Sequence, residues 1–200
     1  MKKNIILAGV GGQGILSIAT VIDLAAVKSG LNIKQAEVHG MSQRGGAVQS
    51  HLRISDTAIH SDLIPLGQAD IILSVEPMEA LRHLPWLSDN GMIVSSIDPV
   101  KNIPNYPDME KITEQIELND CHLLINAAAL AAEIGNPKTA NMIMLGAASP
   151  WTNLEENLIE EGVRLLFETK SKEIADLNIE AFRKGRSLSK KSNVWKNKNL

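Results

Sequence analysis

The segment GVGGQG, from Gly9 to Gly14, holds four glycines within six positions and is the part of the sequence best suited to bind an anion. Because glycine has no side chain, a phosphate group or another backbone can approach this main chain closely. The apolar run before the segment predicts a strand, and the pattern after it predicts a helix, whose first NH groups lack partners within the helix. We therefore expect a site for a phosphate-bearing cofactor formed by Gly9, Gly11, Gly12, Gln13 and Gly14.

Two interpretations of this turn remain open. Gly9, Gly11 and Gly14 satisfy the dinucleotide pattern G-x-G-x-x-G between a predicted strand and a predicted helix. In that interpretation Glu37, near the end of the next predicted strand, is the carboxylate that binds a ribose. In the other interpretation, Gly12 and Gly14 only allow the helix and strand to pack tightly, and no nucleotide binds.

A second segment with chemical potential, HGMSQRGGAVQSHLR, covers residues 39–53. Arg44 offers a planar fork of donors that suits phosphate or carboxylate, and the two glycines after it let the loop fold tightly around a ligand. The predicted site residues of this loop are Ser42, Gln43, Arg44, Gly45 and Gly46. Alternatively, Arg44 pairs with an internal carboxylate such as Glu37 or Glu76 and only orders the loop.

Several other polar residues have an ordinary structural explanation. His51, on a predicted strand, is expected to be a packed or hydrogen-bonded core histidine. Glu76 and Glu79 flank Pro77 after a buried strand, which is typical of acids that oppose a helix dipole. Asp98 and Asn126 also follow strands and could line a crevice at the carboxyl ends of the strands, although Asp before Pro, as at Asp98, is an ordinary start of a turn. No metal site is predicted, because metal-ligand spacing is not found among His39, His60, His83, His122 and Cys121.

Length, charge and cysteine content narrow the possible functions. The 200 residues suit one domain with a substantial core, and the hydrophobic content of 44% indicates a compact fold. A net charge of −3 favours neither nucleic acid nor an anionic membrane as a partner. The single cysteine, Cys121, excludes an intrachain disulfide and an iron-sulfur site built by this chain alone. The sequence shows no targeting or membrane-spanning segment, so we expect a cytoplasmic protein.

Alternation of apolar strands with helical patterns predicts an α/β fold, a three-layer α/β/α sandwich with a mainly parallel sheet and a Rossmann-like first βαβ unit. Residues 47–54 follow the previous strand after only a short loop, which excludes a parallel crossover and predicts one antiparallel strand in a mixed sheet. The predicted strands are 5–10, 33–38, 47–54, 71–75, 92–96 and 123–125, with a helix over 15–28 and helices after Pro150.

The predicted domain is a single unit over residues 1–186. Residues 187–200 are rich in Lys, Ser and Asn, and this composition predicts a polar C-terminal tail.

Taken together, GVGGQG at residues 9–14 and SQRGGAVQSHLR at residues 42–53 closely resemble the gamma-type domain of the 2-oxoacid:ferredoxin oxidoreductases. The resemblance covers residues 1–185. As a free-standing chain of this length, the sequence is most similar to the beta subunits of the indolepyruvate branch of that family. The resemblance implies a complex that converts an aryl 2-oxo acid and coenzyme A to an acyl-CoA and carbon dioxide, with electrons passing to ferredoxin.

The resemblance also implies how the work is divided. Thiamine diphosphate sites in this family use a Gly-Asp-Gly element, and this sequence contains none. An alpha subunit is therefore expected to carry thiamine diphosphate, magnesium and the iron-sulfur clusters, while this chain completes or covers the active site and is inactive alone. Within this hypothesis the glycine turn and Arg44 receive phosphates of coenzyme A.

Two further functions remain open from the residues themselves. The first is a dinucleotide-binding dehydrogenase or nucleotide sensor that uses the glycine turn and Glu37, although no later segment resembles a substrate domain with an acid-base pair. The second is a scaffold that binds no ligand and uses its glycines for packing alone.

Overall fold

The computed structural model describes residues 1–40 and 45–192. Three short 3-10 helices accompany the main elements of this part of the chain. In chain order the elements are β1 (Lys2–Val10), α1 (Ile15–Lys28), β2 (Asn32–His39), β3 (Ala47–Ser55), β4 (Ala69–Ser74), α2 (Pro77–Arg82), η1 (Leu84–Trp86), β5 (Leu87–Ser96), α3 (Met109–Glu117), β6 (His122–Ile125), α4 (Ala127–Glu133), η2 (Pro137–Thr139), α5 (Ala140–Ala148), η3 (Ser149–Trp151), α6 (Glu156–Glu168) and α7 (Lys172–Lys191).

The six strands form one mixed sheet in the order β2-β3-β1-β4-β5-β6. β1, β4, β5 and β6 pair in parallel, whereas β3 runs antiparallel to both of its neighbours, β1 and β2. The prediction of an antiparallel strand within a mainly parallel sheet is therefore confirmed. A short loop between β2 and β3 is sufficient because antiparallel neighbours need no crossover helix.

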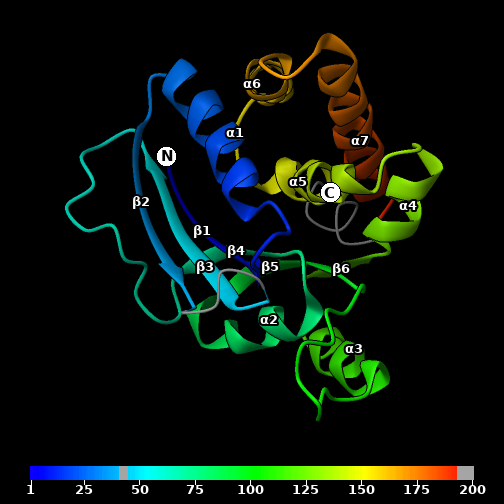
Figure 1. The fold of residues 1–200 in the computed structure, drawn as a ribbon. Coiled ribbons are helices and arrows are strands. Elements are labelled where there is room, and N and C mark those ends of the chain that lie inside the picture. The colour runs from blue at the N-terminus through cyan, green and yellow to red at the C-terminus, as the bar shows by residue number, and fades with distance from the viewer. Residues whose placement is uncertain (41–44, 193–200) are drawn as a thin grey trace.

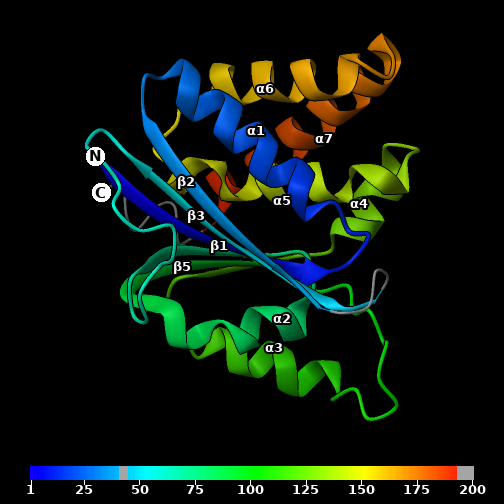
Figure 2. The same ribbon diagram turned by 60° about the vertical axis from the view of Figure 1, so that its left-hand side comes forward.

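Helices cover both faces of the sheet, so the three-layer architecture is also confirmed. In Figures 1 and 2, α2 and α3 lie on one face, and the remaining helices lie on the other, where α6 and α7 form the outermost part. Across residues 1–40 and 45–192, none of these helices has both the length and the apolar character that crossing a membrane requires.

Strand β1 shows how the sequence divides the core between the two faces. Ile5 and Leu7 belong to the large cluster beneath α1 and α5, while Ile6 and Ala8 belong to a smaller cluster on the opposite face. This division follows from the two-residue period of a strand. Every residue from Asn141 to Ala148 of α5 is buried, so this helix lies between the sheet and α7.

The first βαβ unit differs from a Rossmann unit in one respect. β1, α1 and β2 follow one another as predicted, but β3 is inserted between β1 and β2. Glu37 is in register with Ser50, which is in turn in register with Leu7 of β1. Two strand spacings, about 9 to 10 Å, therefore separate Glu37 from β1. The dinucleotide interpretation requires β2 to lie next to β1, and in this sheet β3 separates them.

The last helix extends past the predicted domain boundary at residue 186. α7 continues to Lys191, and Leu188 packs against the large core cluster. Ser189 is fully buried, and its hydroxyl donates to the carbonyl of Ala147 at 2.5 Å. Because this hydroxyl is satisfied within the fold, a Ser- and Lys-rich sequence continues as a packed helix here. Residues 193–200 of the predicted tail lie outside the described residues.

Candidate functional site

The glycine turn links the end of β1 to the start of α1, and Gln13 braces it. The Gln13 side chain accepts from the amide of Val10 at 2.8 Å through Oε1 and donates to the carbonyl of Val75 at 3.0 Å through Nε2. Both ends of this amide are therefore occupied, one by the turn itself and the other by the end of the neighbouring strand β4. Gln13 therefore contributes the shape of the turn, and it also lines the cavity on the far side of the turn.

The glycines of the turn serve different purposes. A Cβ atom at Gly9 would lie 2.4 Å from Cγ2 of Val75, so this glycine allows close packing. Gly14 has φ of 79° and lies against Asn141, whose Nδ2 donates to the Gly14 carbonyl at 3.2 Å. Gly12 has φ of 101°, and a Cβ atom there would meet nothing within 4 Å. The packing interpretation therefore explains Gly9 and Gly14, while Gly12 presents open backbone.

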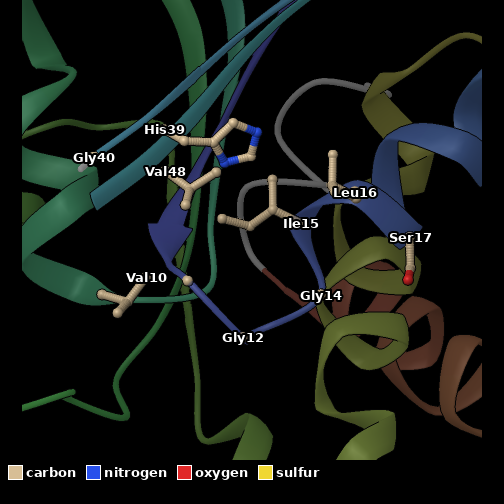
Figure 3. A pocket seen from close by; sticks show the side chains of 10 residues that line it. Val10, Gly12, Gly14, Ile15, Leu16, Ser17, His39, Gly40 and Val48 are labelled. Atoms are coloured by element: carbon tan, nitrogen blue, oxygen red, sulfur yellow. The ribbon is translucent and has the colours of Figure 1, made fainter. Parts of the chain in front are cut away.

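The start of α1 faces a cavity of about 590 Å³ beside the turn. Gly14 caps the helix without a side-chain hydrogen bond, and its carbonyl accepts from the amides of Ser17 and Ile18. The NH groups before them carry the partial positive charge of the helix terminus. Figure 3 shows the cavity, with Ile15, Leu16 and Ser17 on one side and His39 and Val48 on the other. Its lining is Val10, Gly11, Gly12, Gly14, Ile15, Leu16, Ser17, His39, Gly40 and Val48.

The structure brings the two predicted motifs together. The amide of Gly11 donates to the carbonyl of Gly46 at 2.9 Å, and the register of β1 with β3 pairs Val10 with Ala47. The amide of Gly40 donates to the Ala47 carbonyl at 2.9 Å and closes the base of the loop between β2 and β3. The other predicted site residues of this loop, Ser42, Gln43 and Arg44, lie outside the described residues.

His39 supplies an imidazole to the lining of this cavity. Its Nε2 lies 3.3 Å from Oε2 of Glu37, two residues earlier on the same face of β2. His39 is about half exposed, whereas Glu37 is mostly buried. The dinucleotide interpretation needs Glu37 for a ribose, but within the described residues this carboxylate faces His39.

A second cavity, of about 510 Å³, lies on the other side of the glycine turn. Asp98 and the ends of β4 and β5 contribute to it, and Asp98 Oδ2 accepts from the Ser96 hydroxyl at 2.6 Å and the Ala128 amide at 2.8 Å. Asn126 caps α4 by accepting from the Ala129 amide at 2.9 Å. Asp98 therefore lines this crevice while it makes local bonds, and Asn126 is a helix cap.

Three residues of this second cavity had no signal in the sequence. Lys138 and Lys170 are exposed at its rim, and Asn141 is buried against Gly14. These residues come from η2, the loop after α6, and the start of α5, which are distant in sequence from the turn. The packing of α5 and α6 against α1 brings them to this crevice.

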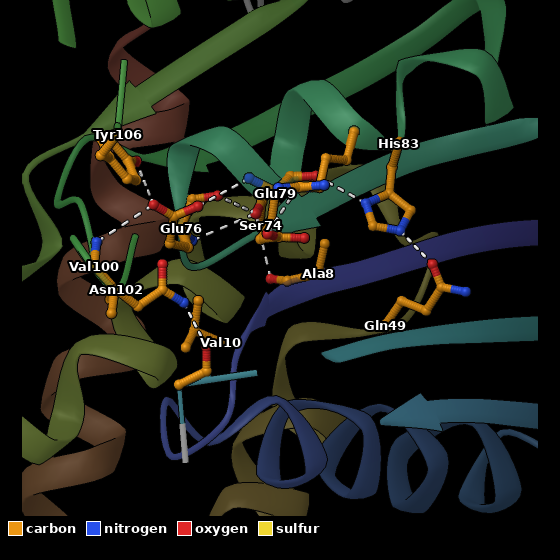
Figure 4. A network of polar contacts seen from close by, with 12 residues as sticks. Ala8, Val10, Gln49, Ser74, Glu76, Glu79, His83, Val100, Asn102 and Tyr106 are labelled. Carbon is orange, nitrogen blue, oxygen red and sulfur yellow. Dashed lines mark hydrogen bonds and ion pairs between the residues drawn. The ribbon is translucent and has the colours of Figure 1, made fainter. Parts of the chain in front are cut away.

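Glu76 is buried at the start of α2, as the helix-dipole interpretation predicted. Its Oε2 accepts from the Glu79 amide at 2.9 Å, which makes it the N-cap of α2. Its Oε1 accepts from the Val100 amide at 3.3 Å and from the hydroxyl of Tyr106. Burial and the Glu76 carboxylate raise the pKa of Tyr106 well above its usual range, so this phenol stays protonated as the donor. Figure 4 shows this network.

His51 is a packed, hydrogen-bonded histidine, as predicted. It is buried on β3, and its Nδ1 accepts from the Ile64 amide at 3.1 Å. Within residues 1–40 and 45–192, no three His, Cys, Asp or Glu side chains come together as a group able to hold a metal ion.

Comparison with protein families gives a match over nearly the whole chain. The profile of the pyruvate ferredoxin/flavodoxin oxidoreductase family matches residues 4–188. Indolepyruvate oxidoreductase subunit IorB of Pyrococcus horikoshii is 37% identical over 201 residues, which cover 95% of this chain and 98% of that protein. The 2-oxoglutarate synthase subunit KorC of Methanothermobacter marburgensis is 30% identical over 191 residues, covering 94% of this chain and 97% of that protein.

Solved structures show the same fold at lower identity. A 2-oxoglutarate:ferredoxin oxidoreductase from Magnetococcus marinus, with 2-oxoglutarate, coenzyme A and succinyl-CoA bound, superimposes with a TM-score of 0.77 at 24% identity. The match covers 96% of this chain but only 32% of that longer chain. Pyruvate oxidoreductase subunit PORC from Thermotoga maritima gives a TM-score of 0.71 at 22% identity, with 93% of this chain and 96% of that chain covered.

Proposed function

Because this chain belongs to the pyruvate ferredoxin/flavodoxin oxidoreductase family, we propose that it is the beta subunit of an indolepyruvate:ferredoxin oxidoreductase. The IorB relatives support this branch, since four of them are 34% to 37% identical over 92% to 95% of the chain. The KorC relatives of the 2-oxoglutarate branch are 25% to 30% identical. The complex would convert an aryl 2-oxo acid and coenzyme A to an acyl-CoA and carbon dioxide, with ferredoxin as electron acceptor.

The cofactors of the complex belong to an alpha subunit in this proposal. Thiamine diphosphate with magnesium supplies carbanion stabilisation when bound, and iron-sulfur clusters carry the electrons. Cys121, the chain's one cysteine, is only partly exposed and cannot supply the set of thiolates that a cluster requires. The contribution of this chain is then a binding surface beside the chemistry, and we expect the chain to be inactive alone.

The hydrogen bond from Gly11 to the Gly46 carbonyl is the observation that carries the proposed site. It ties the second motif to the glycine turn beside a cavity that both segments line, through Gly11, Gly12 and Gly14 on one side and His39, Gly40 and Val48 on the other, at the positive end of α1. Exposed backbone at Gly12 adds room for close approach. We infer that this face meets the alpha subunit and that its NH groups, together with Ser42, Gln43 and Arg44, receive the phosphates of coenzyme A.

Reconstitution with the alpha subunit tests this proposal. The two purified chains together should reduce ferredoxin with indolepyruvate and coenzyme A, and neither chain should do so alone. In the complex, Arg44→Ala should raise the KM for coenzyme A by about tenfold, as expected for loss of one charge-assisted contact. Sustained turnover by this chain alone would exclude the subunit role, and an unchanged KM in the Arg44 variant would exclude the phosphate site.

A dinucleotide-binding function stays the alternative, because Gly9, Gly11 and Gly14 do satisfy the fingerprint. The insertion of β3 and the contact between Glu37 and His39 weigh against it. Calorimetric titration of the chain with NAD and with FAD separates the two functions. Micromolar binding would favour the nucleotide function, and no binding heat would leave the subunit function as the better one.

A further inference from the structure

The connection between β5 and α3, residues 97–108, begins with bonds from Ile97 and Asp98 to β6 and the start of α4, and beyond them it makes two further attachments that reach the glycine-turn side of the sheet. At one, Nδ2 of Asn102 donates to the carbonyl of Gly45, in the second predicted motif. At the other, the Val100 amide and the Tyr106 hydroxyl both donate to Oε1 of Glu76. Figure 4 shows Val100 and Tyr106 with their bonds to Glu76, and Asn102 beside Val100. This connection therefore joins the start of α2 to the loop that follows β2.

Glu76 does more than cap a helix. Capping requires one acceptor, and Oε2 supplies it to the Glu79 amide. The other oxygen, Oε1, accepts its hydrogen bonds from two residues of the connection, Val100 and Tyr106. Glu76 is only 1% exposed, and a buried carboxylate without donors is strongly unfavourable. The fold thus depends on the connection to satisfy Glu76, and the connection depends on Glu76 for its position.

Gly45 and Gly46 have no side chains with which to hold their own place. Gly45 has φ of 79°, a conformation that glycine adopts readily and other residues rarely adopt. Within the described residues, their backbone carbonyls are held by two donors from elsewhere in the chain, Gly11 for Gly46 and Asn102 for Gly45. If the Asn102 contact were removed, only the bond from Gly11 would remain of these two.

We propose that Glu76, Tyr106 and Asn102 are positioning residues, which hold the 97–108 connection so that Gly45 and Gly46 stay against the glycine turn. This inference rests on the proposed function, in which those glycines border the coenzyme A site. The three residues act through the backbone of the loop and touch no reacting atom. Their effect falls on the affinity for coenzyme A and leaves the chemical step on the partner subunit largely unaffected.

Two mild variants in the reconstituted complex test the proposal. Tyr106→Phe removes one hydroxyl from a half-buried ring, and Asn102→Ala removes an exposed amide, so neither disturbs the core. Each should raise the KM for coenzyme A by about tenfold with kcat within about twofold of the wild type, as expected for loss of one well-placed hydrogen bond. Asn105→Ala, an exposed change in the same connection, is the control and should leave both constants unchanged.

Hydrogen exchange of the same complexes gives a readout that is independent of turnover. Peptides that cover Gly45 and Gly46 should exchange faster in Tyr106→Phe and in Asn102→Ala than in the wild type and Asn105→Ala. Unchanged exchange of these peptides in Asn102→Ala would overturn the inference, as would a loss confined to kcat. If the wild-type complex shows no dependence on coenzyme A, the proposed function fails, and the exchange result still decides whether the contacts position this loop.

Discussion

Gly146 of α5 and Gly185 of α7 bring two helix backbones into direct contact. A Cβ atom at Gly146 would lie 1.9 Å from the carbonyl oxygen of Phe182, and a Cβ atom at Gly185 would lie 1.9 Å from that of Ile143. The two glycines thus mark one crossing, where each helix fills the space that a side chain of the other would need. α5 carries the buried layer above the sheet, so this crossing sets how closely α7 covers it.

Replacement of either glycine at this crossing should destabilise the protein. Alanine ordinarily favours a helix by about 1 kcal/mol over glycine. Here a contact of 1.9 Å forces the helices apart, and we expect Gly146→Ala and Gly185→Ala each to lower the free energy of unfolding by about 3 kcal/mol. Urea unfolding measures this, with the exposed Glu180→Ala of α7 as a control that should change stability by less than about 0.5 kcal/mol. A stabilised Gly146→Ala variant would contradict the crossing geometry.

Asp23 of α1 carries a carboxylate whose burial destabilises the folded protein. Its Oδ1 is buried and has no hydrogen-bond partner within the described part of the chain, and burial raises its pKa from 3.8 to about 6. The folded protein therefore binds more protons than the unfolded chain between these two values. Stability falls as the pH rises through this window, and the full cost is present above about pH 6.

Asp23→Asn should therefore stabilise the protein at neutral pH and not in acid. We expect the free energy of unfolding to rise by about 1 kcal/mol near pH 7.5 and to change little near pH 4. The gain is smaller than the full pKa shift would give, because the group is partly solvated. Urea unfolding at the two pH values measures this. The exposed Asp120→Asn serves as the matched control. Equal gains for Asp23→Asn at both pH values would show that ionisation of Asp23 is not the cause.

The local parts of the fold were predictable from the sequence because their signals are local. The run of apolar residues that ends in glycines gave the junction of β1 and α1, and the predicted helix over 15–28 has the bounds of α1. The short interval between the predicted strand 33–38 and residue 47 was enough to predict that β3 is antiparallel, which its pairing confirms. Glu76 beside Pro77 indicated the start of α2, which the capping bond to the Glu79 amide confirms.

Other features depend on contacts between distant segments, which leave no periodic pattern. Asn102 and Gly45 are 57 positions apart, and Tyr106 and Glu76 are 30 apart, so neither contact follows from spacing. The insertion of β3 between β1 and β2 depends on pairing preferences along whole strands. The continuation of α7 through Ser189 likewise depends on an acceptor supplied by the backbone of α5.

His51 makes the stability of the fold sensitive to mild acid. Burial lowers its pKa, and the nearby His83 lowers it further against a smaller opposing effect of Asp62. The bond from the Ile64 amide requires that Nδ1 carry no proton. The unfolded chain therefore binds the proton first, with a pKa near 6.5, so stability is full above that value and falls as the pH decreases below it.

His51→Asn isolates this contribution, because an amide oxygen can accept from the Ile64 amide without titrating. We expect the loss of stability between about pH 7.5 and pH 5.5 to be smaller in this variant than in the wild type, measured by urea unfolding at both values. His60→Asn, at an exposed position, is the control and should keep the wild-type pH dependence. If His51→Asn shows the same pH dependence as the wild type, His51 is not the group that titrates.

Gln13 should control the glycine turn through its shape. Its side chain joins the Val10 amide to the Val75 carbonyl, so Gln13→Ala removes a brace between β1 and the end of β4 and leaves both backbone groups to find other partners. Loss of the two bonds should lower the free energy of unfolding by about 1 to 3 kcal/mol. In the reconstituted complex, the KM for coenzyme A should rise by about tenfold with kcat nearly unchanged, because the NH groups at the start of α1 lose their fixed direction.

The matched control for this brace is Thr20→Ala on the exposed side of α1, which removes a hydroxyl bonded to the Leu16 carbonyl but leaves the turn intact. It should change neither the KM for coenzyme A nor the hydrogen exchange of peptides that cover Gly11 to Gly14. Gln13→Glu sharpens the test, because it keeps an acceptor for Val10 but places a carboxylate oxygen against the Val75 carbonyl, and we expect it to be as disruptive as alanine. A Gln13→Ala complex with a wild-type KM and unchanged exchange at the turn would show that the glycines hold their shape without this side chain.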